Sequence, residues 1–513
     1  MSKFESTIQK DLVTEAVFTE SSEEFILPDY MPEIGRVLRV TATLFPEDPY
    51  LGSDAAEFSG RVEYRLLYSS GEGRVTEAPL FGRYRYRLPV GEKHITSAYT
   101  DERVESVSAR PSAPRKLGIR TRITALPHLL YEDTVGVSLT SLVGDIPAEI
   151  SEGCFSVLAR QPIPYGILHA EDAVTVEGSS PDILTLLSSE SAILTESAEA
   201  KEGYVTARGR ITVTLLLQRM GEPPFVRICT IPFDEDIPTE GCYAGDAVSL
   251  SAYAAPPTVS MEAVGEDTSL HISTEYLLSG ILLRNTEIPV LRDFYVVGEE
   301  HTVNYRTLAL PAAVGCYTGN ITAEGDASLP EDFAADGKCL IPSFTVKEQS
   351  VSALSHRGIV SGTLAVTLLA LGEQGGEKAD LTLPFRIEIP IDGMQAEADS
   401  LWVSVTPVGG NAQRKGGGVH LATELAVTAR AERRVDLKYP VSAVKRGNVT
   451  GMEENTVTVY YPADGDTLWS VGKAYARPIA NLKKQNGFPE NGEPAADDRS
   501  SLDGYAYLLI GGL

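Results

Sequence analysis

One glycine-led segment occurs three times in this chain, and it constrains the fold more than any other feature. The copies begin at Gly60, Gly209 and Gly362, so they stand 149 and 153 positions apart. After each glycine, residues on one side of the segment are consistently apolar, the pattern of a strand with one face in a core. These apolar positions are Val62, Tyr64, Leu66 and Tyr68, then Ile211, Val213, Leu215 and Leu217, then Leu364, Val366, Leu368 and Ala370. Each copy also carries a doubled leucine, which predicts that part of the opposite face is covered too.

Further landmarks recur in the same order at the same spacing. Pro32-Glu33-Ile34 returns as Pro181-Asp182-Ile183, and residues 270–276 resemble residues 419–425. An apolar pair that includes a phenylalanine recurs at positions 80–81, 232–233 and 384–385. The landmarks indicate three homologous modules of about 150 residues, the size of an ordinary domain. We expect modules at 1–146, 147–295 and 296–445, the last divergent, arranged as beads because the period is too long for a solenoid.

The pattern between the landmarks is typical of strands joined by short turns. β-branched and aromatic runs are bounded by Gly, Pro, Asp and Ser, with turn signals such as Ser70-Gly71 and Gly375-Gly376. We therefore predict a mainly β fold of antiparallel, sandwich-like sheets. A short helix is expected at 32–38, where Pro32 suits a first turn, and another at 181–187, capped by Ser180.

Composition narrows the classes of function. Hydrophobic residues make up 43% of the 513 residues, enough for real cores, and the net charge is −27. Such a surface disfavours nucleic acid and anionic membranes as partners. No run approaches the length of a membrane span, and the N-terminal residues lack the apolar core of a signal peptide. We expect a cytosolic protein whose cysteines are reduced and buried; they are Cys154, Cys229, Cys242, Cys316 and Cys339.

The last segment, residues 450–513, changes character. Residues 456–461 predict a strand, and Asp466 or Thr467 can cap the helix that follows. Pro478 opens a second helix, which Asn486-Gly487 ends with a left-handed stop. The inner stripes of the two helices are Leu468, Val471, Gly472 and Tyr475, then Ile479 and Leu482. A final strand near residues 502–510 pairs with the first, which gives the order β-α-α-β.

This segment resembles a LysM domain. The resemblance rests on the Gly-Asp-Thr-Leu-Trp run at 465–469 and on Asn486-Gly487. Gly472 stands where the family usually has alanine, and the loop after the second helix is long and acidic, with Glu490, Glu493, Asp497 and Asp498. In glycan-binding LysM domains that loop helps to form the sugar groove, so its acidic residues argue against glycan binding.

The three modules resemble the SPOCS domains of sporulating clostridia. The matching residues are the Pro-Glu-Ile or Pro-Asp-Ile turn, the glycine-led strand, and the Pro-Phe pairs at 232–233 and 384–385. Several such modules before a LysM domain are similar to the SipL-like family of spore morphogenetic proteins. The resemblance implies a non-enzymatic adaptor in the mother-cell cytoplasm, at the forespore surface. It would bind the coat-basement ATPase SpoIVA through its LysM domain, together with other coat proteins.

The expected partner-binding residues lie in the LysM-like segment: Asp466, Thr467, Trp469 and Asn486. Trp469 is the main candidate because it lies one position off the inner stripe and because Trp is enriched at binding hot spots. The stripe residues Leu468, Val471, Ile479 and Leu482 are interpreted as core.

No catalytic, cofactor-binding or metal-binding residues are predicted. His271 and His420 occupy one repeat position without a second ligand at metal-binding spacing. Residues 234–236 are interpreted as a solvated strand edge, and Gly416-Gly417-Gly418 as a hairpin turn. Two alternatives to the adaptor stay open: a LysM-mediated peptidoglycan-binding protein of the cell wall, and an enzyme of unknown type.

Overall fold

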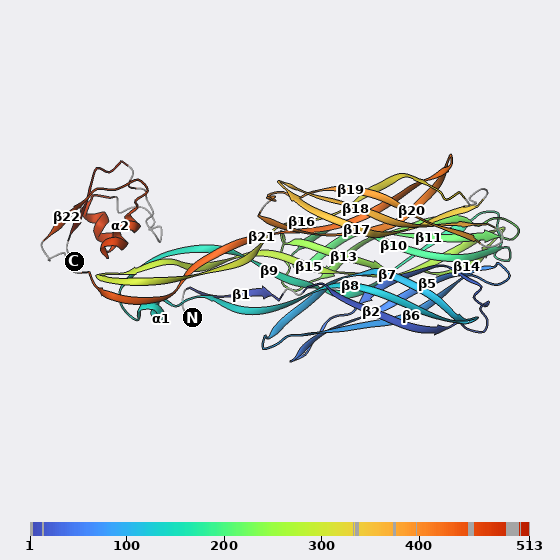
Figure 1. Cartoon of the computed structure of the whole chain (residues 1–513), viewed down its shortest axis with the longest axis horizontal. Coiled ribbons are helices and arrows are strands. Elements are labelled where there is room, and N and C mark those ends of the chain that lie inside the picture. Colours follow the sequence, from blue (N-terminus) through green and yellow to red (C-terminus); the bar gives the residue numbers. More distant parts are fainter. Residues whose placement is uncertain are drawn as a thin grey trace.

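The fold is mainly β, with every paired strand antiparallel. The computed structural model describes residues 4–12, 15–331, 333, 338–372, 376–396, 398–449, 456–488, 502 and 504–511. Three β lobes lie side by side, a long β stem leaves them at one end, and a small helical unit lies beyond the stem (Figure 1). Within the described ranges, no helix has both the length and the apolar character needed to cross a membrane.

Each lobe contains two antiparallel sheets that enclose a hydrophobic core. Lobe 1 comprises β1 (Glu5–Asp11), β2 (Val17–Ile26), β3 (Arg36–Pro46), β4 (Tyr50–Leu51), β5 (Ala55–Ser69), β6 (Val75–Pro89), β7 (Ile95–Ala113) and β8 (Lys116–Gly136). After the short helix α1 (Leu139–Val143), lobe 2 comprises β9 (Ala148–Val176), β10 (Leu184–Lys201), β11 (Tyr204–Arg219), β12 (Phe225–Pro238), β13 (Ala247–Ala254), β14 (Thr258–Val264) and β15 (Asp267–Val296). Lobe 3 comprises β16 (Glu299–Ser328), β17 (Cys339–Leu354), β18 (Arg357–Leu371), β19 (Gly376–Pro390), β20 (Asp399–Lys415) and β21 (Gly418–Asn448).

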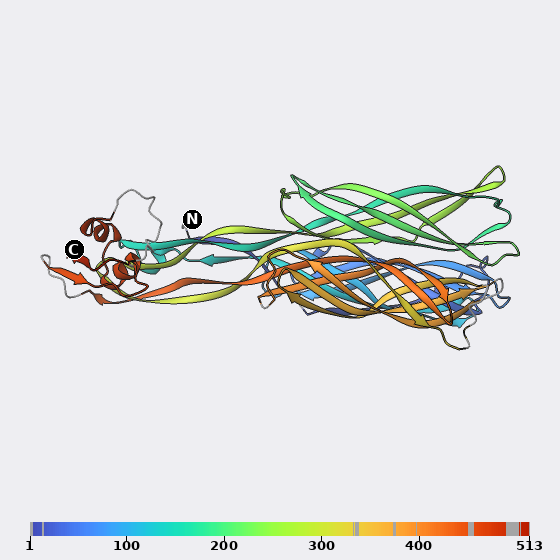
Figure 2. The same cartoon turned by 90° about the horizontal axis from the view of Figure 1, so that it is seen from above.

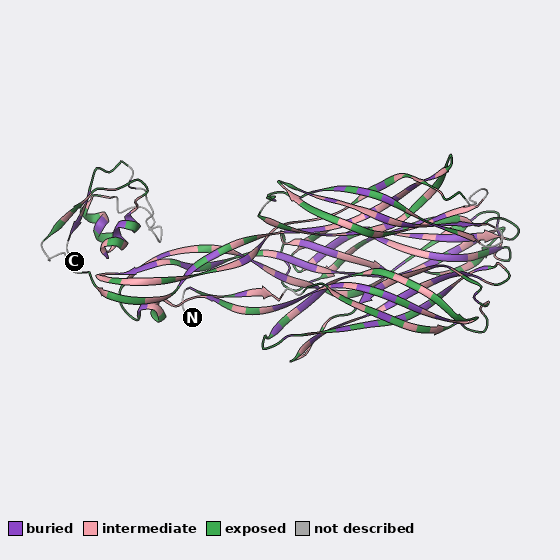
Figure 3. Cartoon of the chain, viewed as in Figure 1, coloured by how far each residue is buried: buried purple, intermediate pink, exposed green. Residues whose placement is uncertain are grey.

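The repeated segments form equivalent central strands. β5 pairs with β3 and β6, β11 with β10 and β12, and β18 with β17 and β19. All twelve apolar positions predicted to face inward are buried, and burial alternates along the strands as Figure 3 shows. The sequence-based predictions of antiparallel strands and of their inner faces are therefore confirmed.

The glycine that opens each repeated segment makes room for an aromatic ring on the next strand. A Cβ on Gly209 would lie 2.0 Å from the Leu194 carbonyl oxygen and 2.6 Å from the Phe233 ring. Gly362 has the same relation to Phe385, at 2.6 Å. In lobe 1 the residue opposite the glycine is Tyr84, not Phe81, which is exposed. The sequence alignment of this landmark in module one was therefore wrong by three residues.

Two expected helices are absent from the described chain. Residues 32–35 form no helix, and β3 begins at Arg36. Residues 181–183 form only a turn before β10 begins at Leu184. Proline and a capping residue suit a turn as well as a helix. Pairing in a sheet stabilises the residues that follow more than a single helical turn would, because a short helix is costly to nucleate.

The lobes share a core, so the expectation of separate beads was wrong. The second leucine of each doubled pair, Leu67, Leu216 or Leu369, leaves its own lobe's core and joins one common buried cluster. Leu38, Leu187 and Ile341 from the neighbouring strands join this axial cluster, in which all three lobes take part, as do Val75 and Leu371. The prediction that the opposite face of each repeated strand is partly buried is confirmed, and the other two lobes bury it.

Equivalent ion pairs join neighbouring lobes. Arg61 of lobe 1 bridges to Glu275 of lobe 2 at 2.9 Å, and Arg210 of lobe 2 bridges to Glu424 of lobe 3 at 2.6 Å. Both partners shift by 149 positions between the two pairs. In the third copy Thr363 occupies the position of these arginines, so an equivalent ion pair cannot form there.

The stem is an extension of the longest strands rather than a separate domain. β9 pairs with β15 and β16 pairs with β21 along almost their whole lengths, and their distal halves leave the lobes together (Figure 2). Val157, Ile288, Leu310 and Leu437 form the stem core with other apolar side chains. Residues 287–296 alone extend it by about 30 Å, at about 3.3 Å per residue. The predicted module boundaries near 146 and 295 fall at the far end of this stem.

The axial cluster can be tested by truncating one of its leucines. Leu216→Ala should lower the free energy of unfolding by about 2–5 kcal/mol, because it leaves a cavity among three lobes. Met220→Ala, at an exposed turn of the same lobe, should change it by less than about 0.5 kcal/mol. Urea unfolding followed by circular dichroism measures both values. Equal, small effects of the two variants would contradict a shared core.

Candidate functional site

The C-terminal unit has the predicted β-α-α-β order. β22 (Val457–Tyr460) pairs with β23 (Leu508–Gly511), and α2 (Leu468–Tyr475) and α3 (Ile479–Gln485) lie between them in sequence. Thr467 is the N-cap of α2: its hydroxyl accepts from the Ser470 backbone N–H at 3.1 Å, and the Ser470 hydroxyl accepts from the Thr467 N–H at 2.9 Å. Gly487, with φ of 70°, follows α3 as predicted.

The unit has a small core of its own. Leu468, Val471 and Leu482 lie buried together with Leu502, Leu508 and Ile510. The interpretation of the first three as core is confirmed. Ile479 is also buried, but it joins Trp469 and Tyr295 of the stem rather than this cluster.

Two of the predicted partner-binding residues stabilise the entry to α2. The Asp466 carboxylate accepts hydrogen bonds from the Tyr460 hydroxyl at 2.6 Å and from the Ala463 backbone N–H at 2.8 Å. The bond from Tyr460 is the main reason that the pKa of Asp466 lies below its usual value. Asp466 and the N-cap Thr467 thus have structural roles within the unit, and their contact with a partner stays a prediction.

Asn486 joins α3 to the sheet. Its side-chain amide donates to the backbone oxygens of Leu482 at 2.9 Å and Leu509 at 2.8 Å. Its side-chain oxygen accepts from the Leu509 N–H at 2.6 Å. These three bonds satisfy backbone groups at the end of α3 and on β23, which explains the asparagine of the Asn-Gly signature. A partner-binding role for Asn486 also stays a prediction.

Trp469 faces this chain's own stem. Its side chain is only 6% exposed, and its ring meets Tyr295 of β15 edge to face, with 5.1 Å between the ring centroids. Its indole N–H donates to the Asp293 carboxylate at 3.1 Å. The surface that Trp469 contacts in this arrangement is the end of the chain's own stem, and its contact with a separate partner stays a prediction.

Asp293 is the polar centre of this docking contact. The β15–β9 register shifts between Leu291 and Asp293, and such bulges redirect the side chains beside them. Lys473 of α2 donates to both carboxylate oxygens, at 2.6 and 2.7 Å, and the Tyr305 hydroxyl donates as well. Burial alone would raise the pKa of Asp293, but the bonds from Lys473, Tyr305 and Trp469 together lower it, so the carboxylate is held ionised.

Gly472 allows α2 to approach the stem. The Tyr295 hydroxyl donates to the Arg477 backbone oxygen at 2.7 Å, directly beside the glycine. A Cβ at position 472 would lie 2.5 Å from that hydroxyl oxygen. The close approach explains why position 472 holds a glycine, although glycine weakens a helix.

The two-stranded sheet of the C-terminal unit carries a set of exposed apolar and aromatic side chains. Val457, Val459 and Tyr461 alternate along β22 and just past it, and Tyr505 and Tyr507 precede β23; all five are exposed, Tyr461 to 73%. This surface was not predicted from the sequence, although the alternation of Val457, Val459 and Tyr461 in the expected strand at 456–461 was its signal. The acidic loop residues Glu490, Glu493, Asp497 and Asp498 lie outside the described residues.

The reactive side chains of the lobes have local partners. His271 meets Glu262 at 3.1 Å and His420 meets Asp326 at 2.7 Å, each on an adjacent strand, as expected. Asp234 is bound to Arg208 on the solvated β12 edge, and Gly416-Gly417 form the predicted hairpin turn. The described parts of the chain contain no group of three His, Cys, Asp or Glu side chains placed to hold a metal.

The cysteines are unpaired, and their burial differs from the expectation. Each of the five is a free thiol among the described residues. Cys229 and Cys242 are buried as expected, whereas Cys154 is exposed on β9 and the other two are partly exposed. Cys154 lies on the stem, where a narrow pair of strands covers fewer positions than a lobe does.

One carboxyl group of lobe 1 has a strongly altered acidity. Glu102 is buried and accepts hydrogen bonds from the hydroxyls of Tyr84 and of Tyr86, the latter at 2.8 Å. Burial raises the pKa of Glu102 to about 7, against the two tyrosine bonds, which lower it. This group therefore titrates near neutral pH inside the lobe core.

Comparison with known proteins adds no family. No protein-family model matches the chain. No curated protein matches it either.

The docking contact can be tested through Gly472. Gly472→Ala should undock the C-terminal unit, because the added methyl group meets the Tyr295 hydroxyl, although alanine is the better helix former by about 1 kcal/mol. Trp469 reports the change in a Trp402→Phe background, since the chain has two tryptophans. Its emission should shift to longer wavelength as the ring becomes exposed.

The matched control removes the Tyr295 hydroxyl group. Adding Tyr295→Phe to Gly472→Ala should restore much of the original emission, because the hydroxyl oxygen that meets the new methyl group is gone. Unchanged Trp469 emission in Gly472→Ala would contradict the close approach of α2 to β15.

Glu102 makes a pH-dependent contribution to stability. Its pKa is about 7 in the folded chain and near 4.5 when exposed, so its contribution is complete below pH 4.5 and is lost as the pH rises through 7. Glu102→Gln should therefore raise the melting temperature relative to the parent at pH 8 and change it little at pH 5. Glu105→Gln, at an exposed position of the same strand, is the control. A Glu102→Gln effect independent of pH would refute the altered acidity.

Proposed function

We propose that this chain is a non-enzymatic adaptor of spore-coat assembly, with three SPOCS-like modules followed by a LysM-like unit at 450–513. Its partner is the coat-basement ATPase SpoIVA, bound through the C-terminal unit. The family resemblance of the motifs supplies the identity of the partner. The shape of the molecule supports a linking role, because it separates one small binding unit from a large body.

One observation carries the proposal: the stem holds the C-terminal unit away from the lobes with one face docked and another open. Trp469, Lys473 and Ile479 are occupied by the stem. Val459 of β22, Tyr461 just past it and Tyr507 before β23 are exposed, so their side chains are available to a partner. Aromatic and β-branched side chains on an open sheet face are typical of protein-binding surfaces.

We therefore place the partner contact on this open sheet face rather than on Trp469. The docked tryptophan orients the unit, and the exposed tyrosines meet the partner. The lobes recruit other coat proteins at the opposite end of the molecule. Many copies bound to one polymeric surface would reinforce each other through effective concentration.

Co-sedimentation with SpoIVA polymer tests the proposal. The full chain should sediment with the polymer, and a chain lacking residues 450–513 should stay in solution. Val459→Glu with Tyr461→Glu should reduce the bound fraction at least tenfold, because each charge must be desolvated at the interface. Asn481→Glu, an exposed change on α3, is the matched control and should bind normally.

Two results would overturn the proposal. One is equal recovery of the full and truncated chains with the polymer. The other is co-sedimentation of the full chain with peptidoglycan sacculi but not with SpoIVA, which would favour the glycan-binding alternative.

A further inference from the structure

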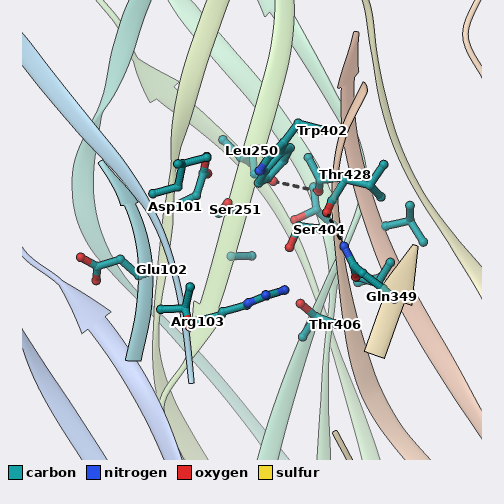
Figure 4. A pocket seen from close by; sticks show the side chains of 18 of the residues that line it. Asp101, Glu102, Arg103, Leu250, Ser251, Gln349, Trp402, Ser404, Thr406 and Thr428 are labelled. Atoms are coloured by element: carbon teal, nitrogen blue, oxygen red, sulfur yellow. Dashed lines mark hydrogen bonds between the residues drawn. The ribbon is translucent and has the colours of Figure 1, made fainter. Parts of the chain in front are cut away.

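A cavity lies where the three lobes meet. Its volume is about 380 Å³, within the range of roughly 300–1,000 Å³ that is typical of small-molecule sites. β7 and β8 of lobe 1, β10 and β13 of lobe 2, and β17, β20 and β21 of lobe 3 contribute to its wall. Figure 4 shows side chains from these strands converging on the space.

The wall combines apolar surface with unsatisfied polar groups. Leu250, Val405 and Trp402 supply apolar surface. Thr195 is 94% buried and lines the cavity, and its hydroxyl has no hydrogen-bond partner among the described residues. Gln349 donates to the Val403 backbone oxygen at 3.1 Å, while its side-chain oxygen is buried without a partner within the described ranges. Buried polar groups of this kind are costly unless something binds to them.

Arg103 supplies one positive charge. Figure 4 shows its guanidinium reaching across the cavity between strands of different lobes. It forms no hydrogen bond or ion pair with the part of the chain that is described. The two acidic residues before it in sequence have other partners. Asp101 binds Arg430 at 2.8 Å, and Glu102 accepts hydrogen bonds from the tyrosine hydroxyls of lobe 1. The guanidinium is therefore available to a ligand.

We propose that this cavity binds a small carboxylic acid with an apolar body. The carboxylate lies against Arg103, whose planar fork matches it with two hydrogen bonds. The hydroxyl of Thr195 and the oxygen of Gln349 meet polar groups on the body of the ligand, which packs against Leu250 and Trp402. A phosphate dianion fits the site less well, because Asp101 lies in the wall and Arg103 is the one cationic side chain among the described residues that line it.

The proposal assigns this site to the junction of the repeats rather than to any one of them. A ligand there contacts all three lobes at once, and therefore stabilises the assembled body over separated lobes. The cavity lies in the body of the lobes, at the other end of the stem from the C-terminal unit (Figure 1), and the proposal does not depend on the proposed binding of SpoIVA.

Trp402 provides the measurement. It lines the cavity, and the Arg430 guanidinium covers it at 4.0 Å from the ring centroid. In a Trp469→Phe background it is the one remaining tryptophan, so its fluorescence reports on the cavity alone. Sodium benzoate is the probe, with inorganic phosphate and glucose as comparison ligands at equal concentration and ionic strength.

Benzoate should change the Trp402 emission saturably and raise the melting temperature, whereas phosphate and glucose should do neither. Arg103→Gln should weaken benzoate binding at least tenfold, whereas Thr195→Val should change it little, because benzoate has no polar group on its body to meet the Thr195 hydroxyl. Arg110→Gln, at an exposed position farther along β7, is the control and should bind as the parent does.

Three results would overturn the proposal. The first is a folded parent protein that shows no saturable response to benzoate. The second is equal binding of benzoate by Arg103→Gln, and the third is tighter binding of phosphate or glucose than of benzoate. Proton–nitrogen NMR spectra of the parent and Arg103→Gln confirm that both are folded, so loss of binding reports on the site.

Discussion

The burial of three leucines from three repeats in one cluster is the constraint on which the architecture depends. Leu67, Leu216 and Leu369 each stand on the face of a central strand that turns away from its own lobe's core. Exposed, they would leave an apolar patch on every lobe. Buried together, they bring the three lobes side by side. The ion pairs of Arg61 and Arg210 then add a polar contact between lobes 1 and 2 and between lobes 2 and 3.

The same arrangement produces the stem and the cavity. With the lobes side by side, the longest strands leave the body at one end, where their apolar faces cover one another. At the far end of the stem, Asp293 and Tyr295 provide a platform for the C-terminal unit, and Gly472 lets α2 approach it. Where the leucine contacts cease, lobe surfaces with more hydroxyl groups face each other and leave a space. The docking platform and the cavity are therefore consequences of how the repeats assemble.

Periodicity predicted the local structure well and the assembly poorly. The alternation after Gly60, Gly209 and Gly362 predicted three strands and their buried faces, and the stripes of residues 468–482 predicted two helices. Period-two patterns identify an inner face, but they do not say whether the outer face meets water or another lobe. The doubled leucines indicated a cover without identifying it. The role of Trp469 was missed in part because its contact, Tyr295, lies 174 positions away.

Two further errors have physical causes. Pro32 and Ser180 favour a helix start and a turn equally, and sheet pairing decided for the turn. Phe81 matched the repeat in residue type, whereas only Tyr84 lies opposite the glycine that makes room for a ring. The open face of β22 carried a sequence signal, since Val457, Val459 and Tyr461 alternate, but a two-stranded sheet offers no rule for which face a partner covers.

The shared axial cluster is tested most directly by methyl NMR of a deuterated chain with labelled leucine methyl groups. Nuclear Overhauser contacts should connect the methyl groups of Leu67, Leu216 and Leu369, which are about 150 positions apart in sequence. The peaks that disappear in Leu216→Ala identify the methyl groups of Leu216. Contacts among all three leucines would establish that the repeats form one body. Strong contacts of each leucine within its own repeat and none between repeats would contradict the account.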